Sequence, residues 1–154
     1  MTSEYDQWIA AFLSEAPAGG LPDLLALSAR KQQALRYGEN AHQRAAWYVP
    51  SSGTPTGLAA LEQLQGKELS LNNLLDLDAA VWCMSEFVQP TCVIVKHASP
   101  CGAASAATIH EAYQRALAAD AESAFGGIVG LNRALDVATA SQMASVFLEV
   151  IAVP

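Results

Sequence analysis

A run of strand-forming residues from Cys92 to Lys96 constrains the fold more than any other part of this 154-residue chain. Three of its five residues are β-branched, which favours a buried strand. The run ends in the adjacent pair Lys96 and His97, and the nearby Pro100 and Gly102 predict that the strand does not continue. Because ligands bind outside the carboxyl ends of strands in open α/β sheets, we expect this pair to lie at a reactive site.

Strand-like and helix-like segments alternate through the rest of the sequence. Apolar residues spaced by three and four predict the clearest helix, which stops before Pro90: Leu74, Leu77, Val81, Met84 and Val88. Further helices are predicted over about 3–13, 108–119 and 136–147, and strands over 44–49, 126–131 and 149–153. This order predicts the α/β class, with a mixed sheet flanked by helices.

The chain divides into a short leading part and one larger unit. Residues 1–22 are interpreted as an N-terminal helix and a linker rich in Pro and Gly, and residues 23–154 as one subdomain. Charged residues make up only 15% of the chain, against about 25% in a typical soluble domain. A large surface is therefore expected to be buried against another chain or a missing domain.

The charges are unevenly placed. The formal net charge of −7 disfavours nucleic acid or an anionic membrane as a partner. Four of the eight basic residues nevertheless fall within fifteen positions: Arg30, Lys31, Arg36 and Arg44. A local basic patch in an acidic protein indicates a small anionic ligand.

The cysteines predict no metal site. Cys83, Cys92 and Cys101 have no metal-ligand spacing, and we interpret them as reduced thiols of a cytoplasmic protein. Zinc nucleobase deaminases carry H-x-E followed by P-C-x-x-C. Here the residue two after His97 is a serine, and no second cysteine follows Cys101 at that spacing.

The Lys96–His97 pair has the chemistry of a proton acceptor beside a cation. An imidazole can accept a proton near neutral pH, and an adjacent ammonium can stabilise an oxyanion. Successive side chains of a strand point to opposite faces, so the backbone must leave strand geometry between the two for both to serve one site. The alternative is an exposed strand end and a structural histidine.

Four other places are weaker candidates. Arg36 and Tyr37 offer a planar donor fork and a ring for a phosphate and its nucleotide, or form an ordinary surface turn. Phe125 and Gly126 allow stacking and close backbone approach to a ligand. Asn72 and Asn73 either bind a ligand or cap the helix that follows, and Glu149 is uninformative alone. The residue types and their spacing do not decide between the binding and the structural interpretations.

Together these motifs resemble the bifunctional purine-biosynthesis (PurH) family, whose transformylase part converts AICAR and 10-formyltetrahydrofolate to formyl-AICAR. The matching segments are Leu35–Asn40 with His42-Gln43, Gln65–Ser70 with Asn72-Asn73, Val95–His97 with Pro100–Gly102, and Ser123–Gly127. Four motifs in the family's order are highly specific together. The resemblance implies a cytidine-deaminase-like, three-layer α/β subdomain without the metal.

The resemblance also implies roles for single residues. His97 looks like the base that takes a proton from the 5-amino group of AICAR, and Lys96 like the group that stabilises the formyl oxygen. Arg36 and Tyr37 resemble the nucleotide-binding pair, with Arg36 near the phosphate. The remaining positions that match the family's nucleotide pocket are Asn72, Phe125, Gly126 and Glu149.

Two departures from the family bear on activity. Ala41 stands where the family usually has proline, which removes stiffness but no reactive group. The chain matches only the first half of the transformylase region, without the cyclohydrolase domain and the second transformylase subdomain, and the family completes its site across a homodimer. We therefore expect weak or no activity from the chain alone. The alternative function is a non-catalytic nucleotide-binding or dimerisation module.

Overall fold

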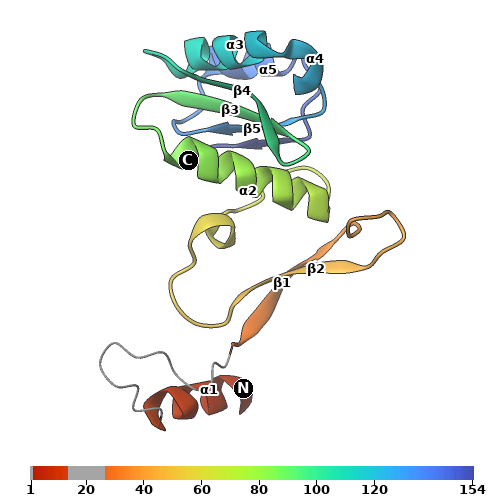
Figure 1. Ribbon diagram of the computed structural model, residues 1–154, viewed down its shortest axis with the longest axis vertical. Coiled ribbons are helices and arrows are strands. Elements are labelled where there is room, and N and C mark those ends of the chain that lie inside the picture. Colours follow the sequence, from red (N-terminus) through yellow and green to blue (C-terminus); the bar gives the residue numbers. More distant parts are fainter. Residues whose placement is uncertain (1, 14–26) are drawn as a thin grey trace.

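The computed structural model describes residues 2–13 and 27–154, and it contains two separate sheets (Figure 1). The first is an antiparallel hairpin of β1 (Ala29–Leu35) and β2 (Ala45–Pro50). The second has four strands in the order β4-β3-β5-β6, with the bounds Ser99–Ser105, Thr91–Lys96, Ile128–Leu131 and Val150–Ala152. Strand β3 pairs antiparallel with β4 and β5, whereas β5 pairs parallel with β6. The predicted α/β class with a mixed sheet is confirmed.

Helices cover both faces of the four-stranded sheet, so this part of the chain has three layers (Figure 1). Helix α2 (Leu71–Ser85) packs on one face, over a core cluster that includes Val93, Val95 and Ile128. Helices α3 (Ile109–Ala119) and α5 (Val137–Met143) cover the other face, with the short α4 (Ala121–Ala124) beside them. Because each face of the sheet meets a helix layer, the first five residues of β3 are all buried.

Strand β3 ends at Lys96, as predicted, but Pro100 and Gly102 belong to a further strand that was not predicted. The chain turns at His97 and Ala98 and continues as β4, in which Pro100 pairs with Val95. Proline has no N–H to donate, so it is tolerated on an edge strand, and β4 is the edge strand of this sheet.

Most predicted helix starts are confirmed, and the ends are less accurate. The side chains of Thr108 and Asp136 accept hydrogen bonds from backbone N–H groups at the starts of α3 and α5. Helix α5 ends at Met143 rather than near residue 147. Val88, predicted as the last core position of α2, lies beyond the helix and is 87% exposed. The short helix α4 lies between the predicted helix over 108–119 and the predicted strand over 126–131, where no helix was predicted.

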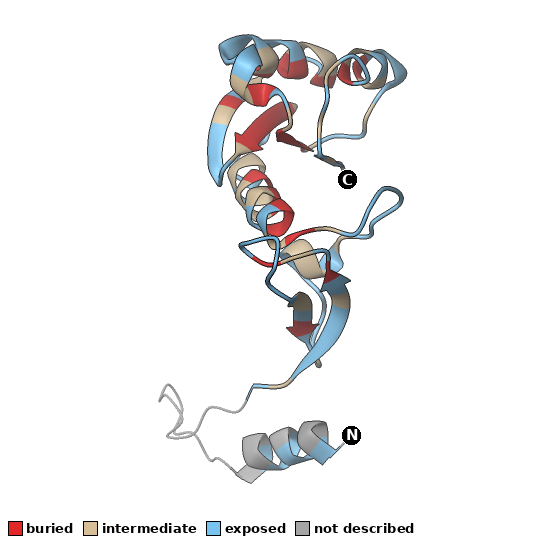
Figure 2. Cartoon of the chain, turned by 90° about the vertical axis from the view of Figure 1, so that its right-hand side faces the viewer, coloured by how far each residue is buried: buried red, intermediate tan, exposed pale blue. Residues whose placement is uncertain are grey.

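The described parts of the chain before α2 are mostly exposed (Figure 2). Helix α1 (Thr2–Leu13) forms as predicted, but Trp8 and Phe12 of its apolar face are exposed. The predicted linker lies outside the described residues. A short 3₁₀ helix, η1 (Gly57–Ala60), precedes α2. No helix in the described residues is long and apolar enough to cross a membrane.

Candidate functional site

The candidate site lies at the edge of the sheet where β3 ends and β5 and β6 begin. Val95 pairs with Ile128, and Ile128 pairs with Val150, so these positions form one row across the sheet. The residues just outside that row come together at this edge: Lys96, Gly126, Gly127 and Glu149. Because β3 is antiparallel to β5 and β5 is parallel to β6, this edge holds the carboxyl end of β3 and the amino ends of β5 and β6.

Lys96 holds the turn that follows α4. Its ammonium donates a hydrogen bond of 2.7 Å to the carbonyl oxygen of Phe125. The next residue, Gly126, has a φ of 72°, a conformation that glycine adopts without steric cost. At Gly127 a Cβ would lie 3.1 Å from the carbonyl oxygen of Val95, so the close approach of this turn to β3 requires a small residue. Lys96 and the Phe125–Gly126 turn therefore form one unit.

His97 and Ala98 form a two-residue turn between β3 and β4, with φ values of 53° and 57°. The backbone leaves strand geometry at His97, as a shared site for both side chains requires. A residue with a Cβ costs about 1–2 kcal/mol in this left-handed region. The backbone N–H of Ala98 donates a hydrogen bond of 2.6 Å to the carboxylate of Asp76 in α2. His97 itself is exposed to solvent.

The Arg36–Tyr37 loop follows β1 and is hydrogen-bonded to the start of α2. The N–H of Arg36 donates to the carbonyl of Leu69, and the N–H of Leu71 donates to the carbonyl of Tyr37. The guanidinium carbon of Arg36 lies 5.1 Å from the centre of the Tyr37 ring, within the range of a cation–π contact. Two long-range backbone bonds thus fix this loop beside the helix. Arg36 is exposed, and Tyr37 is partly buried.

Asn73 connects the loop to the sheet edge. Its side-chain oxygen accepts a bond of 3.4 Å from Arg36, and its side-chain nitrogen donates one of 2.5 Å to the carboxylate of Glu149. The same oxygen accepts from the N–H and the hydroxyl of Ser70, which completes a capping box at the start of α2. Asn72, the predicted binding residue, is exposed and lies one position away.

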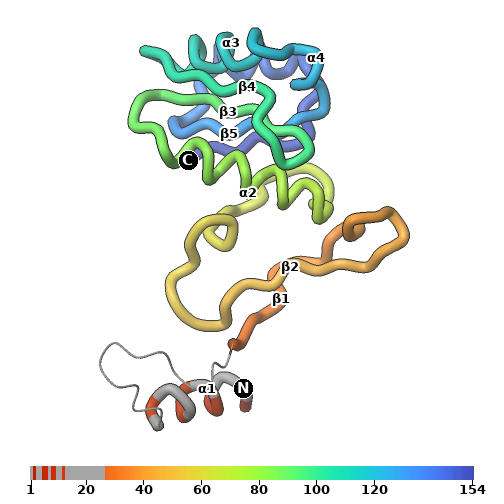
Figure 3. The backbone as a smooth tube through the Cα atoms, viewed as in Figure 1, coloured from red at the N-terminus to blue at the C-terminus, as the bar shows by residue number. Residues whose placement is uncertain are grey.

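Two groups of predicted residues therefore meet α2 within one helical turn. Arg36 and Glu149 join it at Asn73, and the His97 turn joins it at Asp76. Figure 3 shows the β3–β4 turn close to the amino-terminal half of α2. The pattern of sequence motifs did not point to Asp76, and only the capping sequence Ser70-x-x-Asn73 could have indicated the role of Asn73.

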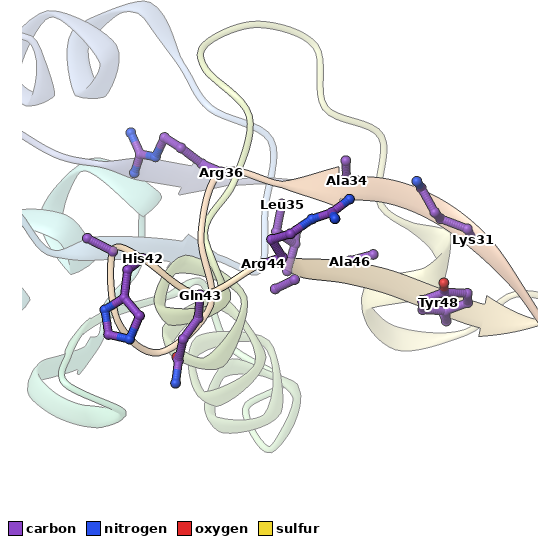
Figure 4. Close-up of a pocket in the computed structure, with 11 residues that line it drawn as sticks. Lys31, Ala34, Leu35, Arg36, His42, Gln43, Arg44, Ala46 and Tyr48 are labelled. Atoms are coloured by element: carbon purple, nitrogen blue, oxygen red, sulfur yellow. The ribbon is translucent and has the colours of Figure 1, made fainter.

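A hollow lies on the β1–β2 hairpin, and its lining includes neither Lys96 nor His97 (Figure 4). It is an open groove of about 560 Å³, and its lining includes four basic side chains and no acidic one: Lys31, Arg36, His42 and Arg44. Ala34 and Ala46 pair across its floor, where their small side chains leave space. The groove can therefore attract an anion, and it shares Arg36 with the network at Asn73.

A β-bulge places Lys31 in this groove. Ala34 pairs with Ala46 and Lys31 pairs with Tyr48, so the ladder skips one residue between Lys31 and Gln33. Ala46 and Tyr48 are two positions apart and lie on one face of β2, which puts Lys31 and Ala34 on that face as well. In Figure 4, Lys31 and Arg44 lie on either side of Ala34.

Within residues 2–13 and 27–154, no group of three or more His, Cys, Asp or Glu side chains could hold a metal ion. Burial raises the pKa of Cys101, and its thiol donates to the carbonyl of Ile94. Phe125 is 60% exposed, with its ring centre 5.5 Å from that of Phe147. The site thus offers cations, an imidazole, an amide, a carboxylate and an aromatic face.

Fold and site define a class of protein: a three-layer α/β domain whose polar side chains meet at one edge of a mixed sheet. The chain belongs to the family described as "AICARFT/IMPCHase bienzyme", which it matches over residues 1–154. It is similar to proteins named bifunctional purine biosynthesis protein PurH. The identity is 53% with that of Thermosynechococcus vestitus, 48% with that of Shouchella clausii and 53% with that of a Nostoc species.

These relatives are much longer than the chain. The alignments cover 100%, 99% and 99% of the chain, but 31%, 30% and 29% of the three relatives. The chain thus spans about 30% of the length of the curated relatives it matches. Membership of a bifunctional purine-biosynthesis family follows from these matches.

Proposed function

We propose that the chain is part of an enzyme that transfers a formyl group from 10-formyltetrahydrofolate to the 5-amino group of AICAR, in the biosynthesis of IMP. One observation carries the proposal: helix α2 links the turn bearing His97 to the residue that hydrogen-bonds both Arg36 and Glu149. A proton acceptor and an arginine beside a nucleotide pocket are what this transfer needs. The family match supports the same reaction.

The two catalytic roles belong to His97 and Lys96. The amine nitrogen of AICAR is a poor nucleophile because its lone pair is shared with the ring. Its attack on the formyl carbon forms a C–N bond, and His97 accepts the proton that the amine loses. Lys96 stabilises the negative charge that develops on the formyl oxygen. The bond from the formyl carbon to the folate nitrogen then breaks, and this nitrogen takes up the proton that His97 accepted. Lys96 uses one N–H on Phe125, and an ammonium has three.

The nucleotide is held by a second group of residues. Arg36 binds the phosphate and Tyr37 lies beside it, while Asn72, Phe125, Gly126 and Glu149 line the rest of the pocket. The exposed guanidinium of Arg36 and the basic groove next to it support this orientation. Glu149 is held by Asn73 and can accept a hydrogen bond from the ligand with its other oxygen.

The finer architecture is also part of the proposal. The three layers are the first subdomain of the transformylase, of the cytidine-deaminase-like kind and without its metal, in a cytoplasmic enzyme. The second subdomain and a second copy complete the pocket, so the chain alone is weakly active or inactive. The exposed groove and the exposed His97 support this reading, because neither encloses a substrate by itself.

The test is the substitution His97→Ala in the complete protein. Loss of a general base should lower the rate of formyl transfer by ~100-fold or more. His110→Ala is the matched control, because this histidine bonds Thr139 and Gln114 on the opposite face of the sheet. Near-normal turnover by the His97 variant would remove this residue from the mechanism.

A second candidate is a non-catalytic nucleotide-binding or dimerisation module. The position of the basic groove on the hairpin favours it, because that groove includes Arg36 but neither Lys96 nor His97. Calorimetric titration of the chain with AICAR separates the two functions. Binding without turnover, even after the rest of a full-length relative is added, supports the module.

A further inference from the structure

Asp76 joins the helix to the turn that carries His97. It lies in the second turn of α2, and its carboxylate accepts the hydrogen bond of 2.6 Å from the N–H of Ala98. A carboxylate is a strong acceptor for a backbone N–H. This bond spans 22 positions of sequence and connects two layers of the fold.

The turn needs support from outside its own sequence. Both of its residues have positive φ, which two-residue hairpin turns reach most readily with Asn-Gly or Asp-Gly. Here the residues are His97 and Ala98, and both carry a Cβ that disfavours this backbone. Among the described hydrogen bonds, the one to Asp76 is the bond in which a side chain contacts the backbone of this turn.

The same helix fixes the other half of the site. Asn73 and Asp76 are three positions apart, so they lie on neighbouring parts of one helix face. Asn73 contacts Arg36 and Glu149, whereas Asp76 contacts the His97 turn. The backbone angles of His97 set the direction of its Cα–Cβ bond, and the bond from Asp76 fixes this backbone to the same helix that contacts Arg36.

We propose that Asp76 is a positioning residue for formyl transfer: it holds the His97–Ala98 turn so that the imidazole faces the nucleotide bound at Arg36. This inference rests on the function proposed above. Asp76 acts through the backbone and does not itself contact the reacting atoms. Its removal should therefore lower kcat and leave the KM for AICAR nearly unchanged.

The first test uses nuclear magnetic resonance on the 154-residue chain. A strong intraresidue cross-peak between H–N and Hα reports positive φ at His97 and Ala98. Asp76→Ala should weaken both cross-peaks and speed amide exchange at Ala98 by at least ~10-fold, as expected for loss of one hydrogen bond. Asp76→Asn keeps an oxygen acceptor and should retain the turn. Asp78→Asn, on the same helix, is the matched control.

The second test measures activity in the complete protein. Asp76→Ala should lower kcat by ~100-fold, since small misplacements of a catalytic group have effects of this size. Adding Ala98→Gly should restore at least ~10-fold of that loss, because glycine adopts positive φ without a Cβ penalty. If Asp76→Ala acted only by lowering stability, adding Ala98→Gly would not restore kcat.

The outcomes separate this inference from the proposed function. Unchanged cross-peaks in the Asp76→Ala chain would overturn the positioning role. So would normal kcat in that variant while His97→Ala is inactive. If His97→Ala itself retains normal turnover, the proposed function fails, and the inference fails with it.

Discussion

The side-chain amide of Asn73 donates a hydrogen bond of 2.5 Å to the carboxylate of Glu149, 76 positions further along the chain. The bond ties the start of α2 to the start of β6, and the amide oxygen of Asn73 serves Ser70 and Arg36 at the same time. Asn73 therefore has a structural role in capping the helix and a connecting role in the candidate site.

Asn73→Ala should lower the free energy of unfolding by about 1–3 kcal/mol, because it leaves the N–H and the hydroxyl of buried Ser70 without the acceptor oxygen of the capping box. Asn72→Ala changes an exposed neighbour and should stay within about 0.5 kcal/mol of the unmodified chain. Urea denaturation of the two variants gives the comparison. Equal effects would show that the capping network does not stabilise the helix start.

The sequence predicted the parts of the fold that depend on local patterns. The run over 92–96 forms β3, and the caps at Thr108 and Asp136 begin their helices. The pairing of β4 was missed because Pro100 blocks a central strand but not an edge strand, and edge position depends on the whole sheet. Strand β1 was not predicted, because its residues are mostly exposed and its sequence shows no clear alternation of apolar and polar residues.

The candidate site was predicted as a set of residues but not as a network. Lys96, Gly126 and Glu149 belong to one sheet edge because of the pairing of β3, β5 and β6, which no local pattern encodes. Asp76 was not identified because a single carboxylate in a helix looks like any solvated one. Its partner is a backbone N–H that becomes available only in the folded turn.

Gly102→Ala should destabilise the chain strongly. A Cβ at this position would lie 2.1 Å from the carbonyl oxygen of Ala116, so β4 or α3 must move. Overpacking of this kind costs about 1–3 kcal/mol, and here the contact is with backbone. Thermal unfolding measures the effect, with Ala103→Ser at the exposed neighbouring position as the control. A melting temperature equal to that of the control would contradict the close packing of β4 on α3.

Cys92 should resist thiol reagents in the folded chain. Burial raises the pKa of Cys92 to about 12, so almost no thiolate forms at pH 8. Brief alkylation with iodoacetamide, followed by peptide mass spectrometry, should modify Cys83 and Cys101, which are partly exposed, before Cys92. Prior labelling of Cys92 under native conditions would show that the core opens easily.

The same pKa shift predicts a loss of stability at high pH. The unfolded thiol has an ordinary pKa of 9.0, so between pH 9 and about 12 only the unfolded chain loses this proton. The unfolded state is favoured progressively over that range. Burial raises the pKa of Tyr113 as well, which adds to the effect. Denaturation midpoints measured from pH 8 to pH 11 should fall, and Cys92→Ser should flatten the fall if the thiol is a main cause.

Arg44→Gln should weaken the binding of AICAR to the chain by a few fold, if the phosphate lies at Arg36 as proposed. Arg44 lines the groove beside Arg36 and raises the local positive potential. The weakening should shrink as salt rises from about 0.05 to 0.5 M, because ions screen exposed charges. Arg30→Gln removes the same charge outside that groove and should have a smaller effect. Equal losses in both variants would indicate a net-charge effect without a local site.

Because of the bulge in the hairpin, Gln32 pairs with no residue of β2. A chain shortened by that one residue can keep Lys31 opposite Tyr48 and Ala34 opposite Ala46, with regular pairing between them. A residue inserted or removed elsewhere in β1 would instead send the side chains beyond it to the opposite face. Length variation in β1 is thus tolerated at one position, and at other positions it would exchange the cationic lining of the groove for the residues that now face away.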